Sequence, residues 1–185
     1  MLAFAPIEIT PEQDQSREAL ESLGNHLQRA QEAASRCRVR LPNRDKALAE
    51  LSQEASRTER EGKSYLGIFA ADVLSALRER HGSEVSEYLL DEISRKQILP
   101  LLPGAKMFRW SAQAVLAVWR SNKELKEIQA EISDFCQMPF VCRAFVGTRI
   151  ATFYIPVRLA VWEAQKDMDE TAGALDGFLE ERKTR

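Results

Sequence analysis

Cysteine and long apolar runs are scarce in this sequence, and each shortage excludes a class of protein. The three cysteines, Cys37, Cys136 and Cys142, form neither a CxxC pair nor an even set, which argues against a structural zinc site and a disulfide-stapled secreted fold. We expect Cys136 and Cys142 to be buried apolar side chains. No run approaches the ~18 apolar residues of a membrane span, and the N-terminal MLAFAPIEIT lacks the basic start of a signal peptide. We therefore expect a cytoplasmic protein without a membrane span.

An excess of positive charge is also missing. The 26 Lys and Arg against 28 Asp and Glu give a net charge of -2, without the basic footprint of a nucleic-acid-binding protein. The motifs G-x-x-x-x-G-K-[ST], G-x-G-x-x-G and G-x-S-x-G do not occur, so P-loop, Rossmann and α/β-hydrolase functions have no support. Hydrophobic residues at 44% and charged residues at 29% are typical of a globular protein, and 185 residues allow one domain plus an appendage. We expect no nucleic-acid partner.

The N-terminal part of the chain carries a short repeat. Between residues 11 and 37, apolar or small residues recur at alternating spacings of three and four, which is typical of the seam of a coiled coil; they include Leu20, Leu23, Leu27, Ala30 and Ala34. The polar residues around the seam favour pairing with a second chain, while docking on the chain's own domain stays open. We expect an N-terminal arm and coiled-coil helix over 1–37, a folded domain over 38–185, and a homodimer formed through the seam.

The rest of the chain alternates between helical and strand patterns. In the first half we expect a helix from Asn43 to about Arg60, a strand over 65–71 and an amphipathic stretch over 73–99 that is broken near Gly82. Two strands over 107–119 follow, around a turn at 111–113, and then a helix over 122–138. The last part should hold a strand, a tight turn at Gly147, a long strand to Trp162 and a final helix from about Asp167. This order predicts an α+β fold, with a mostly antiparallel central sheet flanked by helices.

Four segments point to one family. They are LPNR at 41–44, IFAAD at 68–72, RERHGSEVSEYLL at 78–90 and RWSAQAVLAV at 109–118. In the same order they resemble the motifs GLxNR, DxD, NDxxGHxxGDxxL and RxGGDEFxxxL of the GGDEF domain, the domain of diguanylate cyclases, over about residues 36–185. The resemblance implies a GGDEF, nucleotide-cyclase-like sheet. It also implies a chemistry in which carboxylates hold a divalent metal while two GTP molecules condense into cyclic di-GMP across a dimer.

The carboxylates of that chemistry are missing from the matching positions. The position of the family's metal ligand at the end of the first strand is Ala70, and the signature reads Ser111, Ala112, Gln113, Ala114 and Val115. Hard cations need anionic oxygen ligands, which these side chains do not supply. The resemblance therefore implies no catalytic residue, no metal and no other cofactor.

Ligand recognition is changed as well. By resemblance, Arg78 and Glu87 stand at the positions that read guanine, Ser111 replaces a glycine, and Arg185 stands near a phosphate-binding position, so these four form a vestigial ligand-binding set. Asp72 matches the second Asp of DxD. The acidic residues of the helix that carries Glu87 are expected on a solvated face; they are Glu84, Glu87, Asp91 and Glu92.

Together these observations predict a catalytically inactive GGDEF-like regulatory or interaction module in bacterial signalling, with a signalling protein as a possible partner. Two alternatives stay open. One is an active or residual diguanylate cyclase that makes cyclic di-GMP from GTP. The other is a sensor that binds a different nucleotide or anionic ligand in the former substrate cleft.

Overall fold

The computed structural model describes residues 22, 40–55, 62–164 and 168–181. Two compact units are present, one made of Met1–Arg38 with Phe145–Ile150 and the other of Val39–Ala144 with Ala151–Arg185. The predicted seam from Leu20 to Ala34 lies outside the described residues. No helix in the described part of the chain combines the length and the apolar character needed to cross a membrane.

A four-stranded sheet forms the centre of the second unit. Its strand order is β2 (Lys106–Arg109), β3 (Ala114–Ser121), β1 (Lys63–Ala70) and β6 (Arg158–Glu163), and each neighbouring pair is antiparallel. Every residue of β1 from Tyr65 to Ala70 is buried, because helices cover both faces of this strand. The predicted mostly antiparallel sheet of an α+β fold is thereby confirmed.

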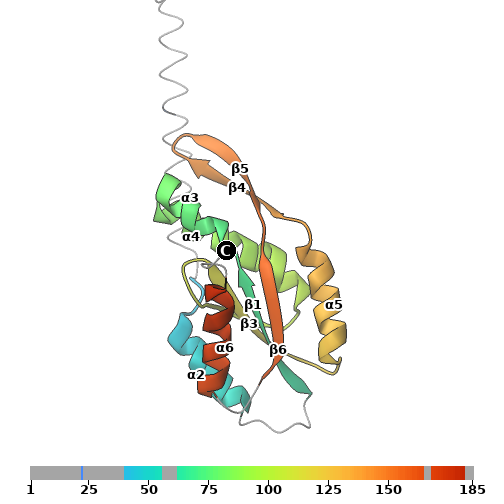
Figure 1. The fold of residues 1–185 in the computed structure, drawn as a ribbon. Coiled ribbons are helices and arrows are strands. Elements are labelled where there is room, and N and C mark those ends of the chain that lie inside the picture. The colour runs from blue at the N-terminus through green and yellow to red at the C-terminus, as the bar shows by residue number, and fades with distance from the viewer. Residues whose placement is uncertain (1–21, 23–39, 56–61, 165–167, 182–185) are drawn as a thin grey trace, which may run out of the picture. The chain divides into compact units, whose positions relative to one another are not determined.

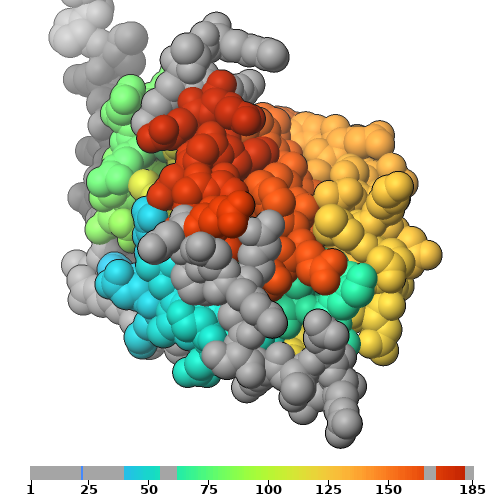
Figure 2. All heavy atoms as spheres, turned by 60° about the horizontal axis from the view of Figure 1, so that its bottom comes forward, coloured from blue at the N-terminus to red at the C-terminus, as the bar shows by residue number. Residues whose placement is uncertain are grey.

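Two helices cover one face of the sheet. The even-numbered residues Leu66, Ile68 and Ala70 of β1 point to this face, where they pack with side chains of α2 (Arg44–Ala55) and α6 (Met168–Glu180). The alternation follows from the two-residue period of a strand. Figures 1 and 2 show α6 beside α2, and a contact between Arg44 and Asp176 joins the two helices.

The opposite face is covered by α3 (Val73–His81), α4 (Ser83–Ile93) and α5 (Leu125–Cys136), which pack on Tyr65 and Phe69 of β1. The predicted break near Gly82 is confirmed, since Gly82 separates α3 from α4 with a φ of +90° that an L-residue rarely adopts. After α4 the chain continues through a π-turn (Ser94–Ile98) and a short 3-10 turn (Leu99–Leu101).

A separate two-stranded hairpin consists of β4 (Phe140–Val146) and β5 (Arg149–Ile155), joined at Gly147. The prediction of one long strand to Trp162 is wrong, because β5 ends at Ile155 and the chain re-enters the central sheet only at Arg158. Pro156 explains the break, since proline has no backbone N–H for a strand ladder. The residues on both sides of Pro156 are strand formers, which concealed the division.

Candidate functional site

Two alanines face each other at the ends of the central strands. Ala70, the last residue of β1, pairs directly with Ala114, the first residue of β3. At both positions the resemblance expects an acidic residue, as it does at Gln113. Both are 0% exposed.

Apolar side chains fill the space beside these alanines. Phe108, Trp110 and Leu175 are buried in one cluster with Ala70 and Ala114, and Leu175 comes from α6. Methyl groups offer no ligand to a hard cation, so these residues do not fit a divalent metal ion. In the described part of the chain, His, Cys, Asp and Glu form no group of three that could hold one.

Arg158 adds a positive charge at the same strand end. It pairs with Ala70 from the other side, as the first residue of β6. Its Nε and Nη2 donate to Oδ2 and Oδ1 of Asp72 at 2.6 and 3.2 Å, a bidentate arrangement that fixes both partners. Asp72, the one acidic residue kept from DxD, is therefore neutralised by a guanidinium group that would repel a divalent cation.

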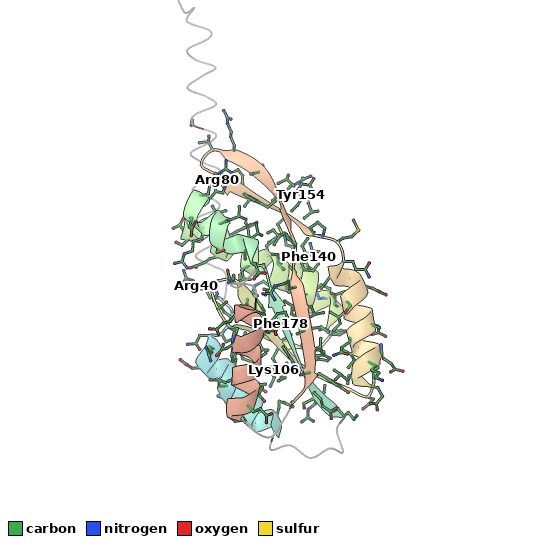
Figure 3. All side chains as sticks on the ribbon, viewed as in Figure 1. Arg40, Arg80, Lys106, Phe140, Tyr154 and Phe178 are labelled. Atoms are coloured by element: carbon green, nitrogen blue, oxygen red, sulfur yellow. The ribbon has the colours of Figure 1, made fainter. Side chains whose placement is uncertain are left out.

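Arg158 also holds α6 over this strand end. Its Nη1 donates to the carbonyl oxygen of Phe178 at 3.2 Å, and its guanidinium lies 4.6 Å from the centre of the Phe178 ring. Figure 3 labels Phe178 on α6. A second tether is Asp176, which accepts from Trp110 Nε1 at 2.9 Å and from Arg44 Nη2 at 2.6 Å. The contacts of Arg158 with Phe178 and of Asp176 with Trp110 hold α6 over the end of the central strands.

The turn from Ser111 to Gln113 uses its backbone groups internally. The N–H groups of Trp110 and Ser111 both donate to the Ala114 carbonyl oxygen, at 3.0 and 3.2 Å, and the Gln113 N–H donates to Ser111 Oγ at 3.2 Å. The Gln113 carbonyl oxygen accepts from the N–H of Ala71 at 2.8 Å, just after β1. Donors of this kind could otherwise bind an anion. Here they stabilise the turn.

The residues predicted to bind ligand have different surroundings. Glu87 on α4 forms long ion pairs with Arg109 at 3.7 Å and Arg40 at 3.9 Å, whereas Arg78 is exposed on α3 and has no ion pair within the described residues. Within the described residues, no hydrogen bond or ion pair joins Arg78, Glu87 and Ser111. Arg185 lies outside the described residues.

The acidic face of α4 is less solvated than its sequence predicts. Asp91 is buried, and its Oδ2 pairs with Arg95 at 3.3 Å while its Oδ1 has no hydrogen-bond partner among the described atoms. Glu84 is exposed, as expected. The error has a physical reason: Asp91 lies among the buried residues Leu90, Ile93 and their neighbours on the inner side of α4.

The two cysteines in the described part of the chain, Cys136 and Cys142, are poor nucleophiles. Cys142 is buried and Cys136 is half-buried, and desolvation raises the pKa of each thiol to about 11. At neutral pH almost none of either group is thiolate, the form that reacts. The expected burial is confirmed for Cys142 and holds in part for Cys136.

Sequence reasoning missed Arg158 and Asp176, which close the strand end. The sequence held one signal for Asp176, since a buried tryptophan such as Trp110 usually donates its N–H to an acceptor. The acceptor comes from a distant helix, however, and no local pattern identifies it. Arg158 likewise meets Asp72 only because β6 lies beside β1.

Comparison with known proteins identifies the fold. No protein-family model matches the sequence, and no curated protein matches it significantly. Among solved structures, the GGDEF domain of FimX from Pseudomonas aeruginosa has a TM-score of 0.60 and 14% identity, with 74% of this chain and 85% of that chain covered. The GGDEF domain of DgcB from Caulobacter crescentus, solved in complex with c-di-GMP, has a TM-score of 0.60 and 12% identity, with 78% and 85% covered.

A third structure is the diguanylate cyclase SiaD from Pseudomonas aeruginosa, solved in complex with its activator SiaC. It has a TM-score of 0.57 and 20% identity, and the alignment covers 90% of this chain and 67% of that chain. The chain has a GGDEF-like fold.

Proposed function

We propose that this chain is a catalytically inactive GGDEF-like module that acts in bacterial signalling by binding another protein. The observation that carries the proposal is the buried pair Ala70 and Ala114, where the resemblance expects acidic residues. The proposal includes an N-terminal arm and coiled-coil helix over 1–37 that forms a homodimer, a GGDEF-like domain over 38–185 and a cytoplasmic location. The solved complex of SiaD with its activator supports a protein partner for a domain of this fold.

The energetics of phosphoryl transfer support inactivity. Such reactions depend on electrostatic stabilisation of the transferring group, which metal ions supply when carboxylates hold them. Each ~1.4 kcal/mol of lost transition-state stabilisation lowers the rate about tenfold. A strand end that presents two methyl groups and the Arg158 guanidinium lacks that stabilisation entirely.

A turnover assay tests the proposal. The full chain is incubated with GTP and Mg²⁺ or Mn²⁺, and cyclic di-GMP is separated by chromatography, with an active diguanylate cyclase as the positive control. We expect no product. Product that disappears in Glu87→Ala, but persists in the matched variant Glu84→Ala on the same helix, would establish an active cyclase and overturn the proposal.

Calorimetry tests the vestigial set of Arg78, Glu87, Ser111 and Arg185. Because Glu87 already pairs with Arg109 and Arg40, we expect GTP to bind weakly or not at all. Tight, metal-independent GTP binding that is lost in Arg78→Ala would instead support the sensor alternative. Unchanged binding in Arg78→Ala would place the ligand elsewhere on the chain.

A further inference from the structure

The tip of the β4–β5 hairpin is partly covered, although it does not belong to the core. Phe145 and Val146, the last residues of β4, are half-buried. Neither of them packs against the two core clusters that the described residues form. Ile150 on β5 is 64% exposed, so the cover reaches only part of the tip. An aromatic side chain that is covered outside the core points to a further packing partner.

The burial of Phe145 differs from that of the rest of its strand face. A two-residue turn at 147–148 places residue 145 opposite residue 150 and residue 141 opposite residue 154, so that these four side chains share the outer face of the hairpin. Val141 and Tyr154, at the far end of this face, are 52% and 67% exposed. The partner of the outer face therefore lies at the tip.

The tip shares a compact unit with the N-terminal part of the chain. Residues 145–150 group with Met1–Arg38, whereas the rest of the hairpin groups with the domain. Ser22, the one described residue before Arg40, is helical, in agreement with the helix that the seam predicts. This grouping favours a segment of the same chain, rather than a separate protein, as the partner of the tip.

The predicted seam suits this contact better than it suits a long coiled coil. After Leu27 its positions are held by Ala30 and Ala34, whose small side chains bury little apolar surface against an identical helix. The distance at which another element packs on a helix depends on the side chains at the contact, and alanines allow a close approach. The large ring of Phe145 can fill the space above two alanines.

The N-terminal segment is long enough to reach the tip. Arg40, just after it, forms an ion pair with Glu87 of α4 at 3.9 Å. The preceding helix, α3, ends at His81, whose ring centre is 5.9 Å from that of Phe153 on β5. Phe153 is about 10 Å along the strand from the tip. Since residues 20–37 span about 27 Å as a helix, the seam can extend from the start of the domain to the tip.

We propose that the hairpin tip, defined as Phe145, Val146 and Ile150, is the docking surface for the chain's own seam, with Ala30 and Ala34 against the ring of Phe145. The contact does not rest on the proposed function. It uses the same seam as the proposed homodimer, so a molecule whose seam lies on the tip is not available for pairing. Release of the seam from the tip is then the step that must precede pairing.

Hydrogen exchange of the full chain, measured by mass spectrometry, tests the proposal. An undocked helix of this length is marginal in water, so protection of residues 20–37 requires a contact. This protection should be equal at about 1 μM and about 50 μM protein, because a contact within one chain does not depend on concentration. Phe145→Asp should speed exchange of the segment at least tenfold. Val141→Asp, which places the same charge on the same face outside the tip, is the matched control and should change nothing.

A reciprocal variant keeps the test decisive if Phe145→Asp disturbs the hairpin itself. Ala34→Lys leaves the hairpin sequence intact and puts a charge into the seam. It should speed exchange of residues 144–151 about tenfold and leave exchange in β1 unchanged.

Three results would contradict the proposal. The first is exchange of residues 20–37 at the rate of an unfolded peptide, and the second is exchange of residues 144–151 that Ala34→Lys does not alter. The third is protection that rises with protein concentration and survives Phe145→Asp. Light scattering on the same samples would then report a dimer, which removes the docking contact and leaves the proposed homodimer in place.

Discussion

The substitution Ala70→Asp tests whether the strand end opposite Ala114 is closed to water and metal. A carboxyl group at position 70 would lose its hydration, because the site is 0% exposed and its cluster is apolar. Arg158 lies across the strand but is already bound by Asp72 on two nitrogens, so it supplies little compensation. Burial of this kind raises the pKa of a carboxyl group from about 3.9 by as much as about 3–5 units.

The cost depends on pH in a defined direction. Since the folded-state pKa lies above the unfolded value, the part of the destabilisation that comes from ionisation is absent below about pH 3.9 and grows as the pH rises towards the folded-state pKa. The cost of burying the neutral carboxyl group is added to it at every pH. At pH 7 the pH lies about 3 units above the unfolded-state pKa, which corresponds to about 4 kcal/mol of destabilisation. At pH 5 the difference is about 1 unit, or about 1.5 kcal/mol. The first figure is a large share of a typical free energy of unfolding of about 5–15 kcal/mol.

Urea unfolding at pH 5 and pH 7, followed by tryptophan fluorescence, measures the effect. Ala112→Asp is the matched control, because Ala112 belongs to the same degenerate signature but is exposed, and it should change stability by less than about 0.5 kcal/mol. A cost for Ala70→Asp below about 1 kcal/mol at both pH values would refute the reasoning. Stabilisation of the variant by Mg²⁺ would do so as well, since the strand end would then be open.

Three further outcomes are expected. Arg158→Gln should lower the free energy of unfolding by about 2–3 kcal/mol in urea titrations, since it removes the bidentate, charge-assisted hydrogen bonds to Asp72. A loss below about 0.5 kcal/mol would contradict this. Gly82→Ala should destabilise the fold by about 1–3 kcal/mol through backbone strain alone. Gly173→Ala, which lies in open space within α6, should stabilise it by about 0.5–1 kcal/mol. Equal melting temperatures for the two variants would contradict both expectations. Because the pKa of its thiol is about 11, Cys142 should react with iodoacetamide at pH 8 about 100 times more slowly than a thiol of pKa 9. Peptide mass spectrometry measures the rate of labelling. Fast labelling would mean that the core opens.

The sequence was informative wherever structure is decided locally. The turn from Ser111 to Gln113 was predictable because polar residues separate two apolar runs, and the Gly82 break was predictable because glycine interrupts a helical period. Both features fix which residues end the central strands. The pairing of Asp72 with Arg158 was beyond reach, because the two lie 86 residues apart and meet only through the order of the strands.

The failures have equally specific causes. Pro156 was visible, but strand-forming residues on both sides of it concealed the division between β5 and β6. The burial of Asp91 was missed because polarity was taken as a guide to exposure, although one helix face carries it among apolar neighbours. The predicted roles of Arg78, Glu87, Ser111 and Arg185 remain predictions.

The central position of β1 has a consequence for the order of events during synthesis. Gly67 pairs with Ala117 on one side and with Val161 on the other, so the second partner emerges from the ribosome long after the strand itself. At about 5–20 residues per second, the apolar run from Tyr65 to Ala70 waits roughly 5–20 seconds for that partner. During this interval at least one edge of a buried strand is exposed to other chains, and both edges are exposed until β3 has been made. The nascent polypeptide therefore needs chaperone protection until β6 arrives, even after β3 is complete.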